Sequence, residues 1–168
     1  MKKYYEDREY IYEVNDILNH DKFNKLGDII HHGDNRLEHS IRVSYYSYRV
    51  AKFLHLNKVA VARAGLLHDF FFEDNLLLDK KRRLRVLLNH PEIACINAKK
   101  YFTLSKLEED IITSHMFPIG KKVPKYLESW LVDFTDDIVS IYEKTRVVSK
   151  QLSTATSFLF LVLLNNLK

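Results

Sequence analysis

The sequence predicts an all-α fold, a single-domain helical bundle, and three observations support this prediction. The 168 residues include only 4 Gly and 3 Pro, fewer turn residues than a β-sandwich or barrel needs. Apolar residues recur at helical spacing, and no alternation typical of a β-strand persists. Charged residues make up 29% and hydrophobic residues 46%, which excludes disordered and collagen-like chains. We therefore expect one domain over residues 1–168.

In the first half of the chain, apolar spacing predicts helices over residues 4–19 and 22–31. Residues 35–38 (Asn-Arg-Leu-Glu) have the form of a capping box and open a long helix that runs to about Leu54. Asn57 can cap the next helix, which continues to about Phe72. No repeat or linker interrupts these segments, so we expect their helices to pack on one another.

In the second half, the His-Pro pair at residues 90–91 marks the start of a helix, because proline is favoured in a first helical turn. Residues 105–108 (Ser-Lys-Leu-Glu) form a second capping box, before a helix that ends near His115. Residues 116–125 contain two of the three prolines and predict a loop. A last long helix is expected from there to about Val148.

Charge and cysteine content narrow the partners and the compartment. Lys and Arg number 26 against 22 Asp and Glu, a net charge of +4 that permits anionic ligands without requiring nucleic acid. We expect no specific nucleic-acid partner. The single cysteine, Cys95, excludes an internal disulfide framework and suits a reducing compartment. The N-terminal residues lack the apolar segment of a secretory signal, so we expect a cytoplasmic protein.

The C-terminal tail, residues 149–168, contains the longest apolar run of the chain. That run covers residues 158–164, far fewer than the roughly 20 residues that span a bilayer. We therefore interpret the tail as a terminal helix that docks on the core or on a second subunit, and we expect no membrane partner. Docking on a second subunit would make the protein a homodimer.

Four of the eight histidines lie on apolar helical faces, namely His39, His68, His90 and His115. A single inward histidine is usually a core residue with a hydrogen-bond partner. Four of them, one followed directly by Asp69, are harder to explain as packing, because every buried imidazole needs a partner. A shared metal site would satisfy all of them together.

The segments around these histidines resemble the HD-domain superfamily of metal-dependent phosphohydrolases. The similarity is carried by residues 38–52, 62–71 and 90–94, and it extends over residues 36–143. In detail these segments are similar to those of a small, largely uncharacterised bacterial HD-hydrolase family. The resemblance implies a helical bundle with a metal site at its centre, which would hold one or two ions.

The resemblance also implies the ligands and the reaction. A first metal would be held by His39, His68, Asp69 and Asp136, and a second by His90 and His115, with Asp69 between them. This mixed imidazole and carboxylate set favours Fe or Mn, while Ni, Zn and Mg also fit. Such metals activate a water as hydroxide and neutralise phosphoryl oxygens. The implied substrate is a nucleotide or another small phosphorylated metabolite.

The choice of the last ligand depends on the register of the final helix. Its main apolar stripe is formed by Leu127, Leu131, Phe134, Ile138 and Ile141. Asp136 lies nearly opposite this stripe and Asp137 lies nearer its edge, so periodicity alone favours Asp137 or no ligand. The likeness of residues 135–138 to the family signature places the ligand at Asp136, and we adopt that register.

Candidate substrate residues follow the His68-Asp69 pair. On a continuous helix Glu73 would lie one turn beyond Asp69, where it could support the metal ligands or transfer a proton, so we include both acids as catalytic candidates. The alternative for Glu73 is a solvated acid at a helix end. The basic run that contains Arg82, Arg83 and Arg85 could bind phosphate at the mouth of the site, or form a solvated face.

Two other functions stay open at this point. Some HD proteins use the same ligand set for oxygen chemistry, so the first is a di-iron oxygenase. The second is a regulatory or binding module that keeps a metal without catalysis. Oxygen consumption would support the oxygenase, and a tightly held metal without turnover would support the module.

Overall fold

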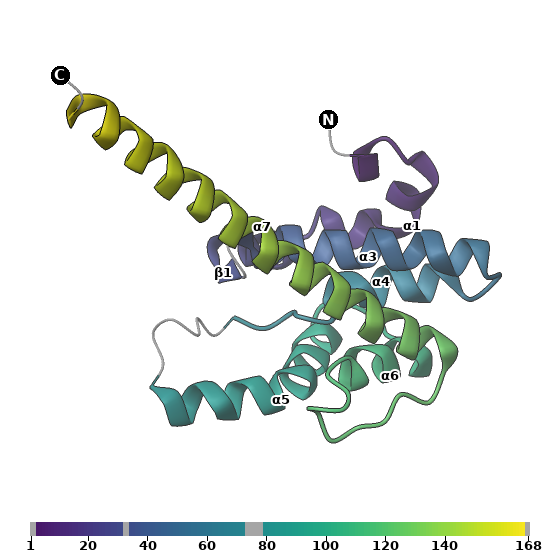
Figure 1. The fold of residues 1–168 in the computed structure, drawn as a ribbon. Coiled ribbons are helices and arrows are strands. Elements are labelled where there is room, and N and C mark those ends of the chain that lie inside the picture. The colour runs from purple at the N-terminus through teal and green to yellow at the C-terminus, as the bar shows by residue number, and fades with distance from the viewer. Residues whose placement is uncertain (1–2, 32–33, 73–78, 167–168) are drawn as a thin grey trace.

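The structure is a computed structural model that describes residues 3–31, 34–72 and 79–166 (Figure 1). The prediction of an all-α helical bundle is confirmed. The α-helices are α1 (Arg8–Leu18), α2 (Asp21–Asn24), α3 (Arg36–Phe53), α4 (Lys58–Leu67), α5 (Lys80–Lys99), α6 (Lys106–Ser114) and α7 (Leu127–Asn166). Two 3-10 turns, η1 (Lys3–Tyr5) and η2 (Lys25–Asp28), and a short antiparallel pair, β1 (Ile30–His31) with β2 (Asp34–Asn35), complete the described elements.

The helix starts predicted at Asn35, Asn57 and Ser105 are confirmed. The Asn35 side chain accepts a hydrogen bond from the Glu38 N–H at 2.9 Å, and Asn57 accepts one from the Ala60 N–H at 3.1 Å. Ser105 forms the reciprocal capping box that opens α6. The end of α4 differs from the prediction, because the helix stops at Leu67 and not near residue 72.

Helix α5 starts earlier than predicted. It begins at Lys80, where the Asp79 side chain accepts a hydrogen bond from the Arg82 N–H at 2.8 Å, so Pro91 lies inside the helix and not in its first turn. A proline has no N–H for the carbonyl one turn earlier, here that of Leu87. The His90 ring supplies the missing donor, since its Nδ1 lies 3.0 Å from that carbonyl oxygen. The same bond therefore supports the helix and orients the ring.

Helices α3 and α4 approach each other closely through two small residues. A Cβ placed on Gly65 would lie only 2.7 Å from the Cα of Ser44, so a larger side chain would force the helices apart. The Ser44 hydroxyl donates to the carbonyl of Ala62 at 2.6 Å and joins the two backbones. This contact brings the rings of His39 and His68 to a centroid distance of 5.4 Å.

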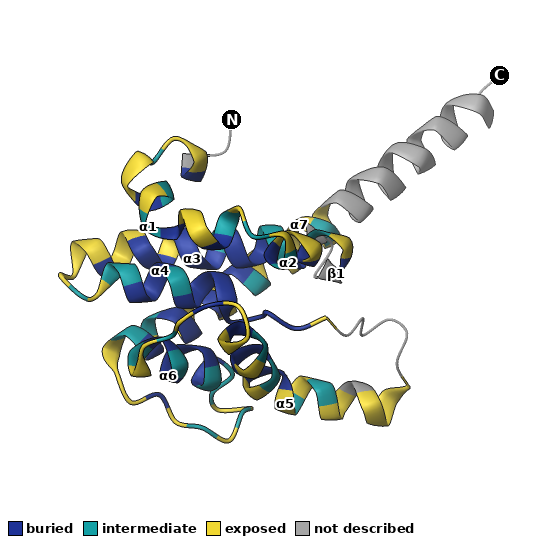
Figure 2. Ribbon diagram, turned by 180° about the vertical axis from the view of Figure 1, so that it is seen from behind, coloured by how far each residue is buried: buried dark blue, intermediate teal, exposed yellow. Residues whose placement is uncertain are grey.

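Helix α7 turns its polar side toward the bundle. Its buried residues are Ser129, Val132, Asp133, Thr135, Asp136, Val139 and Glu143. The main apolar stripe faces outward instead, as Phe134 and Ile141 show with exposures of 64% and 62%. Figure 2 displays the buried faces of the helices that surround the centre of the bundle. Asp136 therefore lies on the buried face of α7, and the main apolar stripe does not.

The predicted C-terminal tail is not a separate helix docked on the core. Helix α7 continues without a break to Asn166, and Figure 1 shows its last turns extending away from the bundle. The side chains after residue 149 lie outside the described part. Within the described residues, we find no helix with an apolar stretch long enough to cross a membrane.

Candidate metal centre

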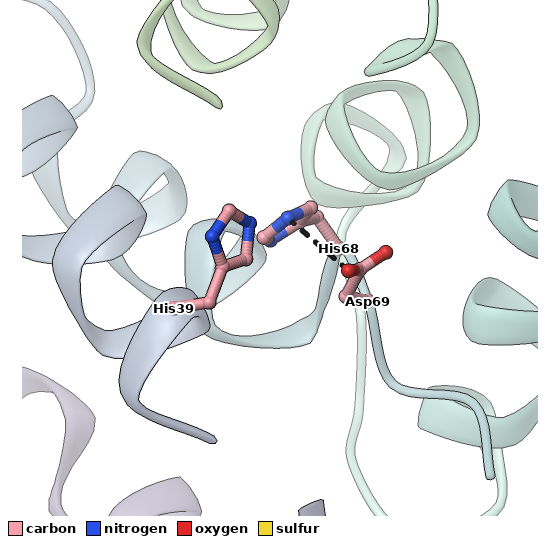
Figure 3. Close-up of side chains that lie close together, drawn as sticks. All are labelled: His39, His68 and Asp69. Carbon is pink, nitrogen blue, oxygen red and sulfur yellow. Dashed lines mark ion pairs between the residues drawn. The ribbon is translucent and has the colours of Figure 1, made fainter. Parts of the chain in front are cut away.

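The structure brings together all six predicted metal ligands. They come from five places in the fold: His39 in the second turn of α3, His68 and Asp69 just after α4, His90 within α5, His115 just after α6, and Asp136 in α7. All six are buried. Figure 3 shows three of them, with the rings of His39 and His68 and the carboxylate of Asp69 close to one another. The early end of α4 allows the His68 and Asp69 side chains to approach the same centre.

The first group of donor atoms surrounds the Asp136 carboxylate. Its Oδ1 lies 2.9 Å from the Nε2 of His39 and 3.6 Å from the Nε2 of His68. The Oδ2 of Asp69 lies 4.0 Å from that same nitrogen of His68. Donor atoms of His39, His68 and Asp69 all lie within 4.8 Å of one another, which is compact enough for one metal ion.

The second group lies on the other side of Asp69. Its Oδ1 is 3.2 Å from the Nε2 of His90 and 3.7 Å from the Nε2 of His115. These three residues also offer donor atoms within 4.8 Å of one another. The two oxygens of Asp69 therefore face two different sets of histidines. A carboxylate in this position can bridge two metal ions.

Hydrogen bonds on the outer side fix which nitrogen of each ring faces the centre. The Nδ1 atoms of His68, His90 and His115 donate to the carbonyl oxygens three residues earlier, at 2.8, 3.0 and 2.7 Å. A carbonyl can only accept, so each Nδ1 carries a proton, and in the neutral ring each Nε2 keeps a lone pair. Metal-binding histidines are held in this way.

Two features inside the centre favour the binding of a cation. The Nε2 of His68 is fully buried and has no hydrogen-bond partner among the described residues. The Nε2 atoms of His90 and His115 lie 2.9 Å apart, although the outer hydrogen bonds leave a lone pair on both. Buried lone pairs that face one another are unfavourable unless a positive ion joins them. The residues present therefore fit a divalent metal.

The charges of the centre support the same conclusion. Without a metal, burial raises the pKa of Asp136, but the positive charge on His68 and the hydrogen bond from His39 outweigh it and hold that pKa well below its usual range. Burial lowers the pKa of His39, but its hydrogen bonds with Asp136 and Glu143 raise it to about 10, so a metal would take the place of that ring's second proton. Burial and the nearby charges of His68 and His90 lower the pKa of His115 to about 3. At neutral pH the carboxylate is thus ionised and this imidazole is neutral, the states in which both bind metal.

Glu143 contacts the cluster of predicted ligands, and the sequence analysis missed it. Its Oε2 lies 3.0 Å from the Nδ1 of His39, and its Oε1 accepts a hydrogen bond from Arg42 at 2.6 Å. The carboxylate thus does for His39 what the backbone carbonyls do for the other three rings. A signal was available, because Glu143 follows Asp136 by two helical turns and so shares its face of α7.

The predicted substrate residues are not drawn into the centre. Arg82 and Arg85 are exposed on the first turns of α5, and no described contact joins them to the metal ligands. The side chain of Arg83 and the whole of Glu73 lie outside the described residues. Asp137, the alternative ligand, is exposed on α7, whereas its neighbour Asp136 is buried.

Comparison with known proteins supports the resemblance. The family model for the HD domain matches residues 36–141, more than half of the chain. The match begins at Arg36, the first residue of α3, and ends within α7, so it includes all six of the clustered residues. No curated protein and no solved structure matches the chain. The narrower likeness to a small bacterial family stays a prediction.

Proposed function

The chain belongs to the HD-domain family, and on that premise we propose that it is a metal-dependent phosphohydrolase acting on a nucleotide or another small phosphorylated metabolite. The observation that carries the proposal is the position of Asp69. Its two oxygens face two sets of inward Nε2 atoms, an arrangement suited to two neighbouring cations. Paired cations are a common device for phosphoester hydrolysis.

The ligands divide between the two proposed metals. The first is assigned to His39, His68, Asp69 and Asp136, and the second to Asp69, His90 and His115. Four imidazoles with two carboxylates favour Fe or Mn, and Ni, Zn and Mg also fit. When bound, such ions activate a water molecule and neutralise charge on phosphoryl oxygens.

The chain itself supplies orientation and a fixed electrostatic environment. The outer hydrogen bonds hold every histidine ring with Nε2 inward before any ligand arrives, so little reorganisation is needed. The carboxylate of Glu143 faces the remaining ring nitrogen of His39. Arg82, Arg83 and Arg85 are our candidates for positioning substrate phosphate and Glu73 for proton transfer, beside the alternatives of a solvated basic face and a solvated acid.

Metal analysis followed by a phosphatase assay tests the proposal. The protein is loaded with Mn or Fe and supplied with a panel of phosphomonoesters, phosphodiesters and nucleotides, while phosphate release is measured. Turnover is expected for the wild type, and loss of both metal and turnover for Asp69→Asn. The matched control, Asp137→Asn, removes an exposed carboxylate and should keep both.

Two other outcomes would contradict the proposal. Iron-dependent oxygen consumption without phosphate release would identify an oxygenase that uses the same ligands. A tightly held metal without turnover on the whole panel would identify a regulatory or binding module.

A further inference from the structure

The outward face of α7 carries a continuous apolar stripe. We call it the outer stripe; it consists of Leu127, Trp130, Phe134, Ile138, Ile141 and Val148. Four of these side chains are more than 60% exposed. Figure 1 shows α7 lying across the bundle, and in the described part of the chain no helix lies in front of it. Exposed apolar patches of this extent mark interaction surfaces in soluble proteins.

The spacing of the outer stripe indicates a helical partner. Leu127, Phe134, Ile141 and Val148 follow one another at intervals of seven residues. A seven-residue apolar repeat keeps one side of a helix against another helix over several turns. The bundle already covers the opposite side of α7, where Asp136 and Glu143 lie. The helix therefore has two packing faces, of which the described part of the chain covers one.

We propose that a second copy of this chain covers the outer stripe, with the two α7 helices antiparallel. A twofold axis midway between Phe134 and Ile141 places Phe134 of each copy opposite Ile141 of the other. The same register sets Leu127 against Val148 at both ends. One arrangement thus pairs the whole repeat with itself, as a symmetric interface requires.

Charge supports the antiparallel direction. Asp137 and Lys144 lie beside the stripe on one side of it, seven residues apart, and both are exposed. The proposed register sets Lys144 of each copy beside Trp130 of the other and brings like charges together at Asp137 alone. A parallel pair would instead place residues of like charge at the same height, which disfavours that pairing.

The size of the surface is sufficient for a specific dimer. A large apolar or aromatic side chain carries about 150–250 Å² of surface, so six half-exposed ones offer on the order of 600 Å² on each copy. Pairing two copies would bury on the order of 1,200 Å², the lower limit of about 1,200–2,000 Å² found in stable interfaces. The interface uses the face of α7 opposite to Asp136, so charges introduced there do not touch the metal centre.

Sedimentation of the full chain tests the dimer. The wild type is expected at twice the chain mass of 19.9 kDa at micromolar concentration. A buried charge should weaken the dimer on the order of 100-fold, so Phe134→Glu and Ile141→Glu should each sediment as monomers. Phe53→Glu is the control, because Phe53 is 80% exposed on α3, outside the stripe. Unchanged metal content and circular dichroism show that the variants are folded.

The result that would overturn the proposal is a wild type that stays monomeric at tens of micromolar, or a dimer that both stripe variants leave intact. Binding of monomeric wild type to phosphatidylcholine vesicles would assign the stripe to lipid and would also overturn it.

Cross-linking tests the direction of the helices. A mixture of Phe134→Cys and Ile141→Cys chains should form an intermolecular disulfide under mild oxidation, whereas Phe134→Cys alone should not. The native Cys95 is buried and serves as the background in both samples. A disulfide in the Phe134→Cys sample alone would show a parallel pair and would refute the antiparallel arrangement.

Discussion

Replacing Glu143 with glutamine removes one charge beside the metal centre while it keeps the size of the side chain. Both oxygens of Glu143 are in use, one facing His39 at 3.0 Å and one accepting from Arg42 at 2.6 Å. Burial raises the pKa of this carboxyl, but its bonds to His39 and Arg42 outweigh burial and hold the pKa below the usual range. The native group is therefore ionised at neutral pH.

Glutamine can replace only one of the two contacts. If its oxygen accepts from Arg42, its amide N–H groups face the Nδ1–H of His39, and two donors meet. The ring then loses the bond that holds its Nε2 toward the centre. Removing such an outer hydrogen bond typically lowers metal affinity 10–100-fold, or about 1.4–2.7 kcal/mol. A hydrogen bond to a charged group is worth about 1.5–3 kcal/mol, which agrees with that range.

Competition with a chromogenic chelator measures this change directly. Metal affinity is compared in the wild type, in Glu143→Gln and in Asp137→Asn, which removes a charge from the exposed side of the same helix. We expect a 10–100-fold loss in the first variant and less than a threefold change in the control. Equal affinities in all three proteins would refute the idea that Glu143 orients His39.

Four further predictions concern the centre and its surroundings. Asp136→Asn should impair metal binding far more than Asp137→Asn, since only the first side chain faces the donors; the reverse result in a chelator titration would shift the register by one residue. His115→Ala should lower metal content from two ions per chain toward one, and elemental analysis of a wild type with a single ion would contradict this. Burial and the charge of Asp137 raise the pKa of Asp133 from 3.8 to about 7, so its contribution to stability is fully present below pH 3.8 and is lost as the pH rises from there through 7. Asp133→Asn should therefore raise the melting temperature of the metal-free protein by a few degrees at about pH 8, by less at about pH 5 and not at about pH 3.5. Arg85→Ala should raise KM with little change in kcat if the residue binds substrate phosphate, and an unchanged KM would make it a solvated arginine.

Local signals were sufficient to predict most helix starts and the donors of the centre. Asn35, Asn57 and Ser105 act on backbone groups only three residues away, so the sequence carries all the information that the cap needs. The pair His68-Asp69 could be recognised because a motif marks it. These features depend little on what the rest of the chain does.

The start of α5 was misplaced because two local rules conflict there: Asp79 caps the helix at the Arg82 N–H, whereas the rule for proline favours a later start at Pro91. Proline is favoured in a first turn, yet Pro91 lies inside the helix because the His90 ring takes the carbonyl that the proline leaves without a donor. This compensation depends on the direction of one side chain. The same bond also turns the Nε2 of His90 inward, so the helix and the centre depend on one contact.

The orientation of α7 could not be predicted from the spacing of its apolar residues, for a different reason. The pattern of apolar residues divides a helix into faces, but it does not say which neighbour covers each face. In α7 the polar face meets the bundle, because Asp136 and Glu143 find partners in His39 and Arg42 there. The resemblance selected Asp136, which lies buried 2.9 Å from the Nε2 of His39, whereas Glu143 belongs to no motif that was recognised and needed the structure.

The order of the donors along the chain has a consequence for synthesis. Asp136 and Glu143 lie in the last helix, about a hundred residues after His39, which they contact. A nascent chain that ends before α7 contains every histidine of the centre but lacks the carboxylate that completes the first group. The cation can therefore be held by the full ligand set only after the final helix has been translated and has folded back on α3. Full ligation of a metal would therefore report that the chain has been made at least as far as Asp136.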